Sequence, residues 1–402
     1  GDHRDLHSFP TRRSSDLDLT RVLAGPFCTM MFADMGAEVI KIEEAGKGDD
    51  TRQMGPFKNG ESAYFMNLNR NKKGLTLNLK NPKAKEIFLE LVKKADVVIE
   101  NFRPGTMEKL GLGYEDLKKV NSAIIYAAIS GFGHTGRYSQ RPGYDIISQA
   151  MSGLMSTTGW PGGEPTRTGT AMGDVLGGLS CAIGILSAVY NRASTGLGQK
   201  VDVALVDSAV ASLEIINMIY LVEGRIPQRI GNRYESTYPY DSFRASDGSL
   251  VIGVANDKLW AQLCEAMDLG HLINDPRFTR VRDRVANHAE LKPLLEEWTT
   301  RFTVDEVCEK VSAAGVPCAP LLNIEQVVND PHIGGDREMF VEMEHPVAGK
   351  MKVTGSHIKL SDTPAGVRTP SPALGQNNEE ILGSLLGMTS EAIAALRAEG
   401  AV

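Results

Sequence analysis

The stretch DLTRVLAGPFCTMMFADMGAEVIKIE, residues 18–43, decides the fold because it reads as strand, helix and strand. Its first residues are typical of the end of a strand that runs into a loop. Residues 26–35 predict a helix, with Pro26 in the first turn and Gly36 just past the last. Residues 37–43 follow as a short buried strand. Strands and helices that alternate over short connections are typical of a parallel sheet.

The same alternation continues along the chain. Residues 75–79, 96–101, 123–130 and 199–204 predict further strands, and residues 82–95 and 114–121 predict helices between them. Residues 144–155 and 174–193 predict long, well-buried helices. We therefore expect an α/β fold with a large, Rossmann-like parallel-sheet domain.

The length of 402 residues exceeds what one core usually supports, so we expect a second domain. Residues 18–224 are assigned to the N-terminal part of the large domain. A smaller α+β domain is expected over residues 225–325, with a hairpin turn at Asp247–Gly248. Residues 326–402, which contain a second hairpin over 339–355, are expected to return to the large domain.

Residues 1–17 are set apart as a non-native tail. HSFPTRRSSDL, residues 7–17, has no apolar period and resembles the in-frame translation of a sequencing adapter. Such a segment is excluded from fold reasoning. The alternative is a genuine, disordered polar tail.

The amino-acid composition argues against several classes of protein function. The net charge is -7 and no basic stripe with interleaved aromatic residues occurs, so we expect no nucleic-acid partner. The longest apolar run, around residues 176–190, is broken by glycines and predicts no membrane span. The histidines are scattered and the five cysteines form no C-x-x-C pair, which predicts no metal site, no disulfide framework and a cytoplasmic location.

GTAMGDVLGG, residues 169–178, places one carboxylate among glycines at the start of an apolar run. Asp174 is either the N-cap of a helix or a nucleophile. A helix N-terminus favours the ionised carboxylate. Gly173, Gly177 and Gly178 lack side chains and could let a bulky ligand approach.

Two other stretches could carry chemistry. GFGHTG, residues 131–136, matches G-x-G-x-x-G after a strand, but a dinucleotide site also needs a helix that opens at once. RYSQRPG follows instead, so a mobile loop or lid is the better interpretation. ENFRPG, residues 100–105, ends a buried parallel strand, where ligands of α/β sheets bind or where the chain merely turns.

Several stretches taken together resemble the class III coenzyme A transferase family, also called the CaiB/BaiF family. They run in family order from Asp18 to about Gly387, and they include residues 17–43, NRNKKGLTLNLK, VVIENFRPGTMEKLGLGYEDL, ISGFGHTG, RPGYDIISQAMSGLMSTTG, GTAMGDVLGGL, GQKVDVAL and HPVAGKMKVTG.

The resemblance implies a homodimer of two interlocked chains, with the active site between the large domain of one chain and the small domain of the other. It implies that Asp174 attacks an acyl-CoA thioester, passes through an acyl anhydride and an aspartyl-CoA thioester, and delivers coenzyme A to a small carboxylic acid. No permanently bound cofactor is implied, because coenzyme A is the group carried by the substrate. Succinyl-CoA and a small dicarboxylate are the family-level expectation.

The resemblance also assigns contacts to coenzyme A. They are Leu23, Ala24, Leu77, Asn78, Leu79, Lys80, Asn101, Phe102, Arg103, Lys109, Arg141, Pro142, Gly143 and Tyr144, with Asp145, Gly173, Gly177 and Gly178 in supporting positions. Residues 77–80 correspond to the segment beside the adenine, and residues 141–144 to the segment beside the pantetheine arm. Glu44 stands where many relatives carry an arginine, which departs from the family pattern.

Alternatives stay open at this point. A sister branch racemises 2-methylacyl-CoA esters, but it usually carries histidine and aspartate where this chain has Tyr144 and Asp145, and tyrosine is a poor base near neutral pH. A nicotinamide-linked oxidoreductase would use residues 131–136, and a non-catalytic CoA-binding protein would tolerate the loss of Asp174. Arg52, Arg70 and Arg141 are equal candidates for the acceptor carboxylate. Oxalate is a less favoured acceptor, because the chain lacks the glycine-run loop of the oxalate-using members.

Overall fold

The computed structural model describes residues 15–402, which divide into two compact units. Among these residues, unit 1 comprises residues 15–154, Arg167–Val222 and Pro331–Val402, and unit 2 comprises Met155–Thr166 and Glu223–Asp330. The sequence placed the corresponding boundaries after residues 224 and 325. It did not predict that residues 155–166 belong to the second unit.

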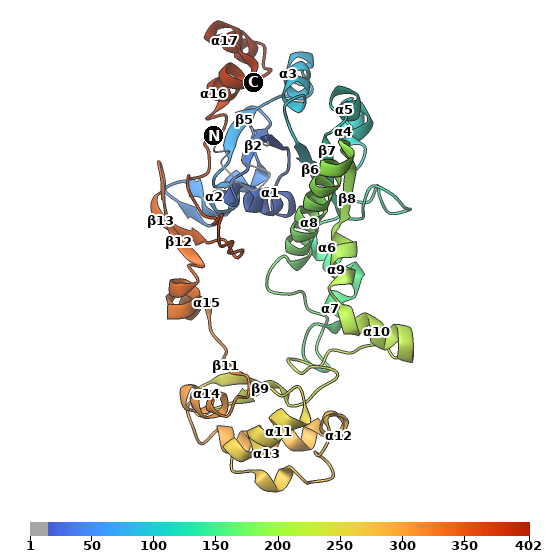
Figure 1. Ribbon diagram of the computed structural model, residues 1–402, viewed down its shortest axis with the longest axis vertical. Helices are drawn as coiled ribbons and strands as arrows, with labels where there is room; N and C mark the ends of the chain where they lie inside the picture. Colours follow the sequence, from blue (N-terminus) through green and yellow to red (C-terminus); the bar gives the residue numbers. More distant parts are fainter. Residues whose placement is uncertain (1–14) are drawn as a thin grey trace, which may run out of the picture. The chain divides into compact units, whose positions relative to one another are not determined.

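Unit 1 is built on a six-stranded parallel sheet (Figure 1). Its strands are β1 (Ser15–Asp18), β2 (Glu38–Glu43), β5 (Lys73–Thr76), β6 (Val97–Glu100), β7 (Ile125–Ser130) and β8 (Lys200–Ala204). The order across the sheet is β5-β2-β1-β6-β7-β8. The chain therefore moves outward from β1 to β5, returns to β6 on the other side of β1, and moves outward again. This reversal leaves a crevice between the loops after β1 and β6, where α/β sheets bind ligands.

Two strand predictions need correction. Ser15, Asp16 and Leu17, assigned to the excluded tail, form β1 in register with β2 and β6, and Leu17 is completely buried. Four residues with polar neighbours have too little apolar alternation to be recognised as a central strand. The strand expected over residues 75–79 is instead β5, Lys73–Thr76, so residues 77–79 follow the carboxyl end of this strand. The rest of the predicted tail, residues 1–14, lies outside the described residues.

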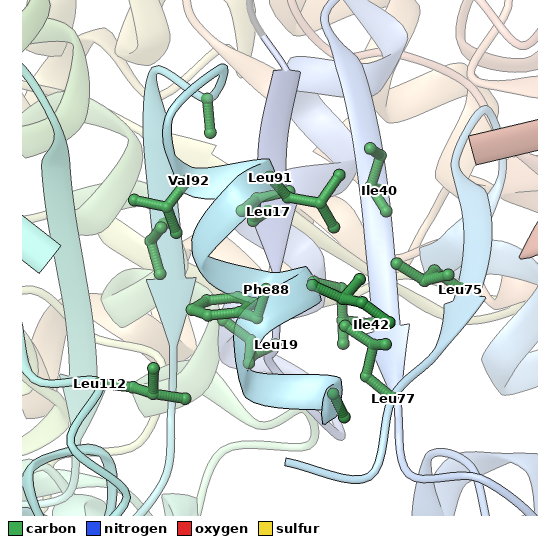
Figure 2. Close-up of a cluster of buried hydrophobic side chains, with 14 of the residues drawn as sticks. Leu17, Leu19, Ile40, Ile42, Leu75, Leu77, Phe88, Leu91, Val92 and Leu112 are labelled. Atoms are coloured by element: carbon green, nitrogen blue, oxygen red, sulfur yellow. The ribbon is translucent and has the colours of Figure 1, made fainter. Parts of the chain in front are cut away.

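Helices cover both faces of the sheet, because alternate side chains of each strand point to opposite faces. On one face, α3 (Pro82–Val92) and α5 (Tyr114–Val120) share a core with α16 (Asn378–Leu386) and α17 (Ser390–Ala398). Figure 2 shows Phe88 and Leu91 of α3 beside Leu17 and Ile40 of the strands.

The opposite face is covered by α1 (Ala24–Asp34) and α8 (Met172–Thr195), which share the second core of unit 1. By length and composition α8 could cross a membrane, with a mean hydropathy of 1.7 in its most apolar window. The expectation that no apolar run reaches that length was wrong, because the glycines within it do not end the helix. Cys181 and Ile185 of α8 are buried against the sheet, as in core helices, which pass the same test.

The helix expected over residues 144–155 is broken at Gly153, whose φ is 96°. It forms α6 (Asp145–Ser152) and α7 (Leu154–Thr157). After β8 the chain continues into α9 (Leu205–Ala211) and α10 (Glu214–Glu223).

Unit 2 packs helices on a three-stranded antiparallel sheet. Its strands are β9 (Tyr240–Arg244), β10 (Ser249–Gly253) and β11 (Cys318–Pro320), and its main helices are α11 (Asp257–Ala266), α12 (Val281–Ala286), α13 (His288–Thr299) and α14 (Val304–Ala313). The predicted hairpin turn at Asp247–Gly248 is confirmed by the pairing of β9 with β10. The second predicted hairpin is also confirmed, by β12 (Phe340–His345) and β13 (Gly349–Thr354) in unit 1.

Candidate active site

Two adjoining pockets occupy the crevice at the carboxyl ends of the strands. The first has a volume of about 210 Å³ and lies between the loops after β1, β6 and β7 and the start of α8. The second, of about 350 Å³, lies between the loops after β2 and β5 and residues 106–110. Arg21 and Phe102 line both pockets. Together they make one elongated site at the position where the strand order reverses.

The structure brings most of the predicted contacts to these two pockets. The first is lined by Leu23, Ala24, Asn101, Phe102, Arg103, Arg141, Pro142, Gly143, Tyr144 and Asp174. The second is lined by Leu77, Asn78, Leu79, Lys80 and Lys109. Asp145, Gly173, Gly177 and Gly178 line neither pocket.

Asp174 is not the cap of α8. It is the third residue of the helix, whose N-cap position is Ala171. The N–H group of Gly173 is instead capped from α6, because it donates to Asp145 Oδ1 at 2.7 Å. The other Asp145 oxygen accepts from Gln149 Nε2 at 2.8 Å. Within residues 15–402 no hydrogen bond or ion pair ties up the Asp174 carboxylate, so it can face a ligand in the first pocket.

Burial and the nearby charge of Asp145 raise the pKa of Asp174 from 3.8 to about 7. The expectation that the helix N-terminus would hold this group ionised is therefore wrong below about pH 7, because desolvation of the carboxylate and the Asp145 charge outweigh the helix dipole. Burial and the Asp174 charge also raise the pKa of Tyr64 to about 12, so a neutral phenol lies near the carboxylate. A carboxylate with few compensating partners is more basic and more nucleophilic than an exposed one.

The three glycines of α8 serve packing rather than ligand access, contrary to the expectation. A Cβ atom on Gly173 would lie 2.2 Å from Ser148 Oγ, and one on Gly177 would lie 2.5 Å from Leu205 Cδ2. A Cβ on Gly178 would lie 2.7 Å from the carbonyl oxygen of Ala24, at the start of α1. The glycines thus let α8 approach α6, α9 and α1 closely, which sets the position of Asp174.

The GFGHTG segment forms a loop and does not open a helix. After Gly136 the chain stays irregular until α6 begins at Asp145, so the condition for the nicotinamide site fails. A Cβ on Gly131 would lie 2.6 Å from Gly143 Cα, and a Cβ on Gly143 would lie 2.7 Å from Gly131 Cα. The two ends of the loop therefore cross in direct backbone contact, which only glycines allow, and both line the first pocket.

The structure separates the three candidate arginines. Arg70 is buried and pairs with Asp34 at 2.7 Å, and Arg52 pairs with Glu43 at 2.7 Å. Of the three, Arg141 alone lines the first pocket. Glu44, the departure from the family pattern, lines the second pocket, 3.9 Å from Lys80 Nζ.

The sequence missed pocket residues in the loops that follow the strands. In the first pocket they are Arg21, Val22, Asp50, Pro104, Ile129, Ser130 and Leu205, with Gly131, which the sequence predicts only as part of a loop. In the second they are Leu19, Ile42, Glu43, Gly48, Asp49, Thr106 and Leu110. Ligands of α/β sheets bind beyond the carboxyl ends of parallel strands, so the ends of the other predicted strands are the signal in the sequence that points to these residues. No group of side chains suited to hold a metal ion occurs in the described part of the chain.

Known proteins resemble this chain over most of its length. Residues 17–378 match the model of the family described as CoA-transferase family III. The succinyl-CoA:glutarate CoA-transferase of Homo sapiens is 40% identical over 387 residues, which cover 96% of this chain and 88% of that protein. The acetyl-CoA:oxalate CoA-transferase of Acetobacter aceti is 43% identical over 346 residues, or 86% of this chain and 87% of that protein.

A solved structure shares the fold as well. The crystal structure of a CaiB/BaiF family protein from Brucella suis superposes with a TM-score of 0.82 at 37% identity, and covers 94% of this chain and 100% of that one. The family model, the relatives and the solved structure all extend over nearly the whole chain. The chain therefore belongs to CoA-transferase family III, the CaiB/BaiF family.

Proposed function

We propose that Asp174 is the nucleophile with which this enzyme transfers coenzyme A between an acyl-CoA and a carboxylic acid. The observation that carries the proposal is the position of its carboxylate: half-buried, without a protein partner among residues 15–402, and in the pocket where the strand order reverses. The family match supports CoA transfer as the reaction.

The proposed reaction exchanges acyl groups in balanced steps. An Asp174 oxygen attacks the thioester carbonyl, the C–S bond breaks, and coenzyme A leaves as a thiolate from an acyl anhydride. The thiolate then attacks the Asp174 carbonyl, which releases the donor acid as a carboxylate and leaves an aspartyl-CoA thioester. The acceptor carboxylate displaces the thiolate, and the thiolate in turn attacks the acceptor carbonyl. Asp174 is regenerated as a carboxylate and the new acyl-CoA departs.

The second pocket is proposed to hold the nucleotide end of coenzyme A. Its walls combine apolar side chains, such as Leu77 and Leu79, with the cationic Lys80 and Lys109. Apolar walls suit a base, and ammonium groups suit phosphates. The pantetheine arm would then pass over Arg21 and Phe102, which stack on each other and line both pockets, toward Asp174 in the first pocket.

Dicarboxylic acids are proposed as the exchanged acids. Relatives similar to this chain are named for succinyl-CoA with glutarate and for succinyl-CoA with mesaconate. A dicarboxylic acid keeps one free carboxylate while the other reacts. Arg141, in the same pocket as Asp174, supplies a planar pair of donors that matches such a group.

The remaining features of the enzyme are proposed as follows. Coenzyme A is carried by the substrate, and no further cofactor takes part. The enzyme acts as an interlocked homodimer, which is supported by large apolar side chains exposed on α8 and α10, among them Tyr190 and Leu221. A cytoplasmic location is supported by five free cysteines.

The proposal is tested by trapping the intermediate. The protein is incubated with succinyl-CoA and a panel of acids that includes glutarate, mesaconate and oxalate, and hydroxylamine is then added. We expect mass spectrometry to find a hydroxamate at Asp174 and coenzyme A on one added acid. Asp174→Asn should show neither, whereas Asp207→Asn, an exposed carboxylate on α9 outside both pockets, should behave as the native protein. No adduct with any acid, together with loss of α-deuterium from a branched acyl-CoA, would instead establish racemisation.

A further inference from the structure

A completely buried ion pair that the proposed reaction does not use lies next to the second pocket, which Asp49 helps to line. Lys41 Nζ of β2 is 2.8 Å from Asp49 Oδ2, and both side chains have no exposed area. A buried ion pair costs desolvation energy that its attraction repays only with good geometry and further hydrogen bonds. The groups that the pair binds should therefore show why a buried ion pair is present at this position.

Asp49 Oδ1 accepts from the N–H and hydroxyl groups of Thr51, at 2.9 and 2.8 Å, and so caps the short helix Asp50–Gln53. The other groups that the pair binds belong to the turn after β1, here called the Val22 turn and defined as residues 20–23. Lys41 Nζ also donates to the carbonyl oxygen of Thr20. The N–H group of Val22 donates to Asp49 Oδ1 at 3.2 Å. One ion pair thus binds two backbone groups of the same turn, one through each partner.

Val22 itself is held in an unfavourable conformation. Its φ is 68°, in the left-handed region, where a β-branched residue is a genuine outlier. Such a conformation persists only where the surroundings enforce it, and it is concentrated at ligand sites. Val22 lines the first pocket together with Asp174.

The other side of the turn is held from β6. The N–H group of Arg21 donates to Asn101 Oδ1 at 2.8 Å, and Asn101 Nδ2 donates to the Arg21 carbonyl oxygen at 2.6 Å. The turn then leads directly into α1, because the Leu23 carbonyl accepts the Phe27 N–H at 2.8 Å. The conformation of Val22 therefore decides where Leu23 and Ala24 stand in the wall of the pocket.

We propose that Lys41 and Asp49 are positioning residues that hold Val22 in its left-handed conformation and so fix the wall of the CoA pocket beside Asp174. The hydrogen bonds of Lys41 and Asp49 to the Val22 turn are here called the clamp. The expected effect of the clamp on the kinetics rests on the proposed function, whereas the clamp itself does not. If the clamp enforces strain, removing the strain at Val22 should make Asp49 dispensable. Glycine adopts a positive φ freely, so Val22→Gly provides that removal.

The test is a double-mutant cycle of Asp49→Ala with Val22→Gly in the full chain. The matched control is Asp34→Ala, which breaks another buried ion pair, with Arg70 at 2.7 Å, whose residues line neither pocket. The readouts are kcat/KM for succinyl-CoA, the Kd of coenzyme A by calorimetry, and amide hydrogen exchange of residues 20–24. If either alanine variant does not fold, Asp49→Asn and Asp34→Asn replace the pair.

We expect Asp49→Ala to lower kcat/KM and coenzyme A affinity at least tenfold, and Asp34→Ala to lower them less than threefold. In the Val22→Gly background the loss caused by Asp49→Ala should shrink to less than threefold. Amides 20–24 should exchange faster in Asp49→Ala and unchanged in Asp34→Ala. Equal losses in both backgrounds, or unchanged exchange in the turn, would overturn the inference. A native protein that transfers no coenzyme A would instead overturn the proposed function, while the exchange data would still decide the clamp.

Discussion

The Asp174 side chain stands half-buried near a second carboxylate, Asp145, and both features oppose its ionisation. Asp145 nevertheless has a separate task, since it accepts the Gly173 N–H group at 2.7 Å and so caps α8. Asp145 accepts the hydrogen bond from the first turn of α8, and the Asp174 carboxylate is left without a partner among residues 15–402. A site that needs a reactive carboxylate gains from this division, because a group committed to capping is a poorer nucleophile.

The pH dependence of the reaction follows from this arrangement. Burial and the Asp145 charge raise the pKa of Asp174 to about 7, and only the ionised form can attack. We expect kcat/KM to rise with pH and to level off above about pH 7. Asp145→Asn keeps an oxygen that can accept from Gly173 but removes the negative charge, so the rising limb should move to lower pH.

The measurement is the pH profile of kcat/KM between about pH 5 and pH 9. Asp207→Asn removes an exposed charge from α9 and should leave the profile in place. A limb in Asp145→Asn that moves to higher pH would contradict this account of the Asp174 environment.

The raised pKa also predicts a cost in stability. Its folded value, about 7, exceeds the ordinary value of 3.8, so the unfolded chain releases this proton first as pH rises. Stability is then lost progressively between these two values, and the whole loss is present above pH 7. Asp174→Asn carries no charge and should raise the free energy of unfolding at pH 8 by about 1–3 kcal/mol. Urea unfolding at pH 8 and below pH 4 checks this, since the gain should vanish at the lower pH.

At the scale of the elements, the position of Asp174 depends on how closely α8 approaches α1. Gly178→Ala would place a methyl group 2.7 Å from a backbone oxygen of α1, which cannot rotate away. We expect it to lower the free energy of unfolding by about 1–3 kcal/mol and to reduce CoA transfer.

Gly383→Ala is the matched control for this substitution. Gly383 lies inside α16, and its added Cβ would meet an atom of Met388 at an ordinary 3.7 Å. The higher helix propensity of alanine should then make the variant neutral or up to about 1 kcal/mol more stable. A Gly178→Ala protein as stable as Gly383→Ala would show that the helix contact is not tight.

The same scale shows why some elements were predicted and others not. Helix α3 has an apolar stripe and begins at Pro82 as predicted, but it ends at Val92 and not at residue 95. Strand β1 has four residues and polar residues on both sides. Its local sequence pattern therefore does not predict a strand, and it becomes one because it pairs with both β2 and β6. Gly153 ends α6 within a run whose composition favours one continuous helix.

At the scale of the whole molecule, unit 1 carries large apolar side chains that are exposed. Tyr190 is 81% exposed and Leu221 is 71% exposed, on α8 and α10. Exposed apolar side chains that gather into a large patch mark interaction sites. We expect light scattering to give a mass of two chains of 43.6 kDa, consistent with the proposed homodimer.

Tyr190→Arg combined with Leu221→Arg should shift the mass toward one chain. Glu86→Arg, an exposed change on α3 over the opposite face of the sheet, should leave the mass unchanged. A native protein with the mass of one chain at micromolar concentration would contradict the homodimer.

The sequence by itself determined most of the elements, the class of fold and about half of the residues that line the pockets. Period-two and helical apolar patterns are local properties of the sequence. The motifs that resemble the family identify site residues directly, without knowledge of where the fold brings them. Only the tertiary structure decided the strand order, the capping of α8 by Asp145, the packing role of the three glycines and the clamp on Val22. Each of these depends on contacts between residues far apart in the chain, such as Gly178 with Ala24 or Asp49 with Val22. Such contacts leave no local period, because they arise only when the sheet brings the ends of its strands together.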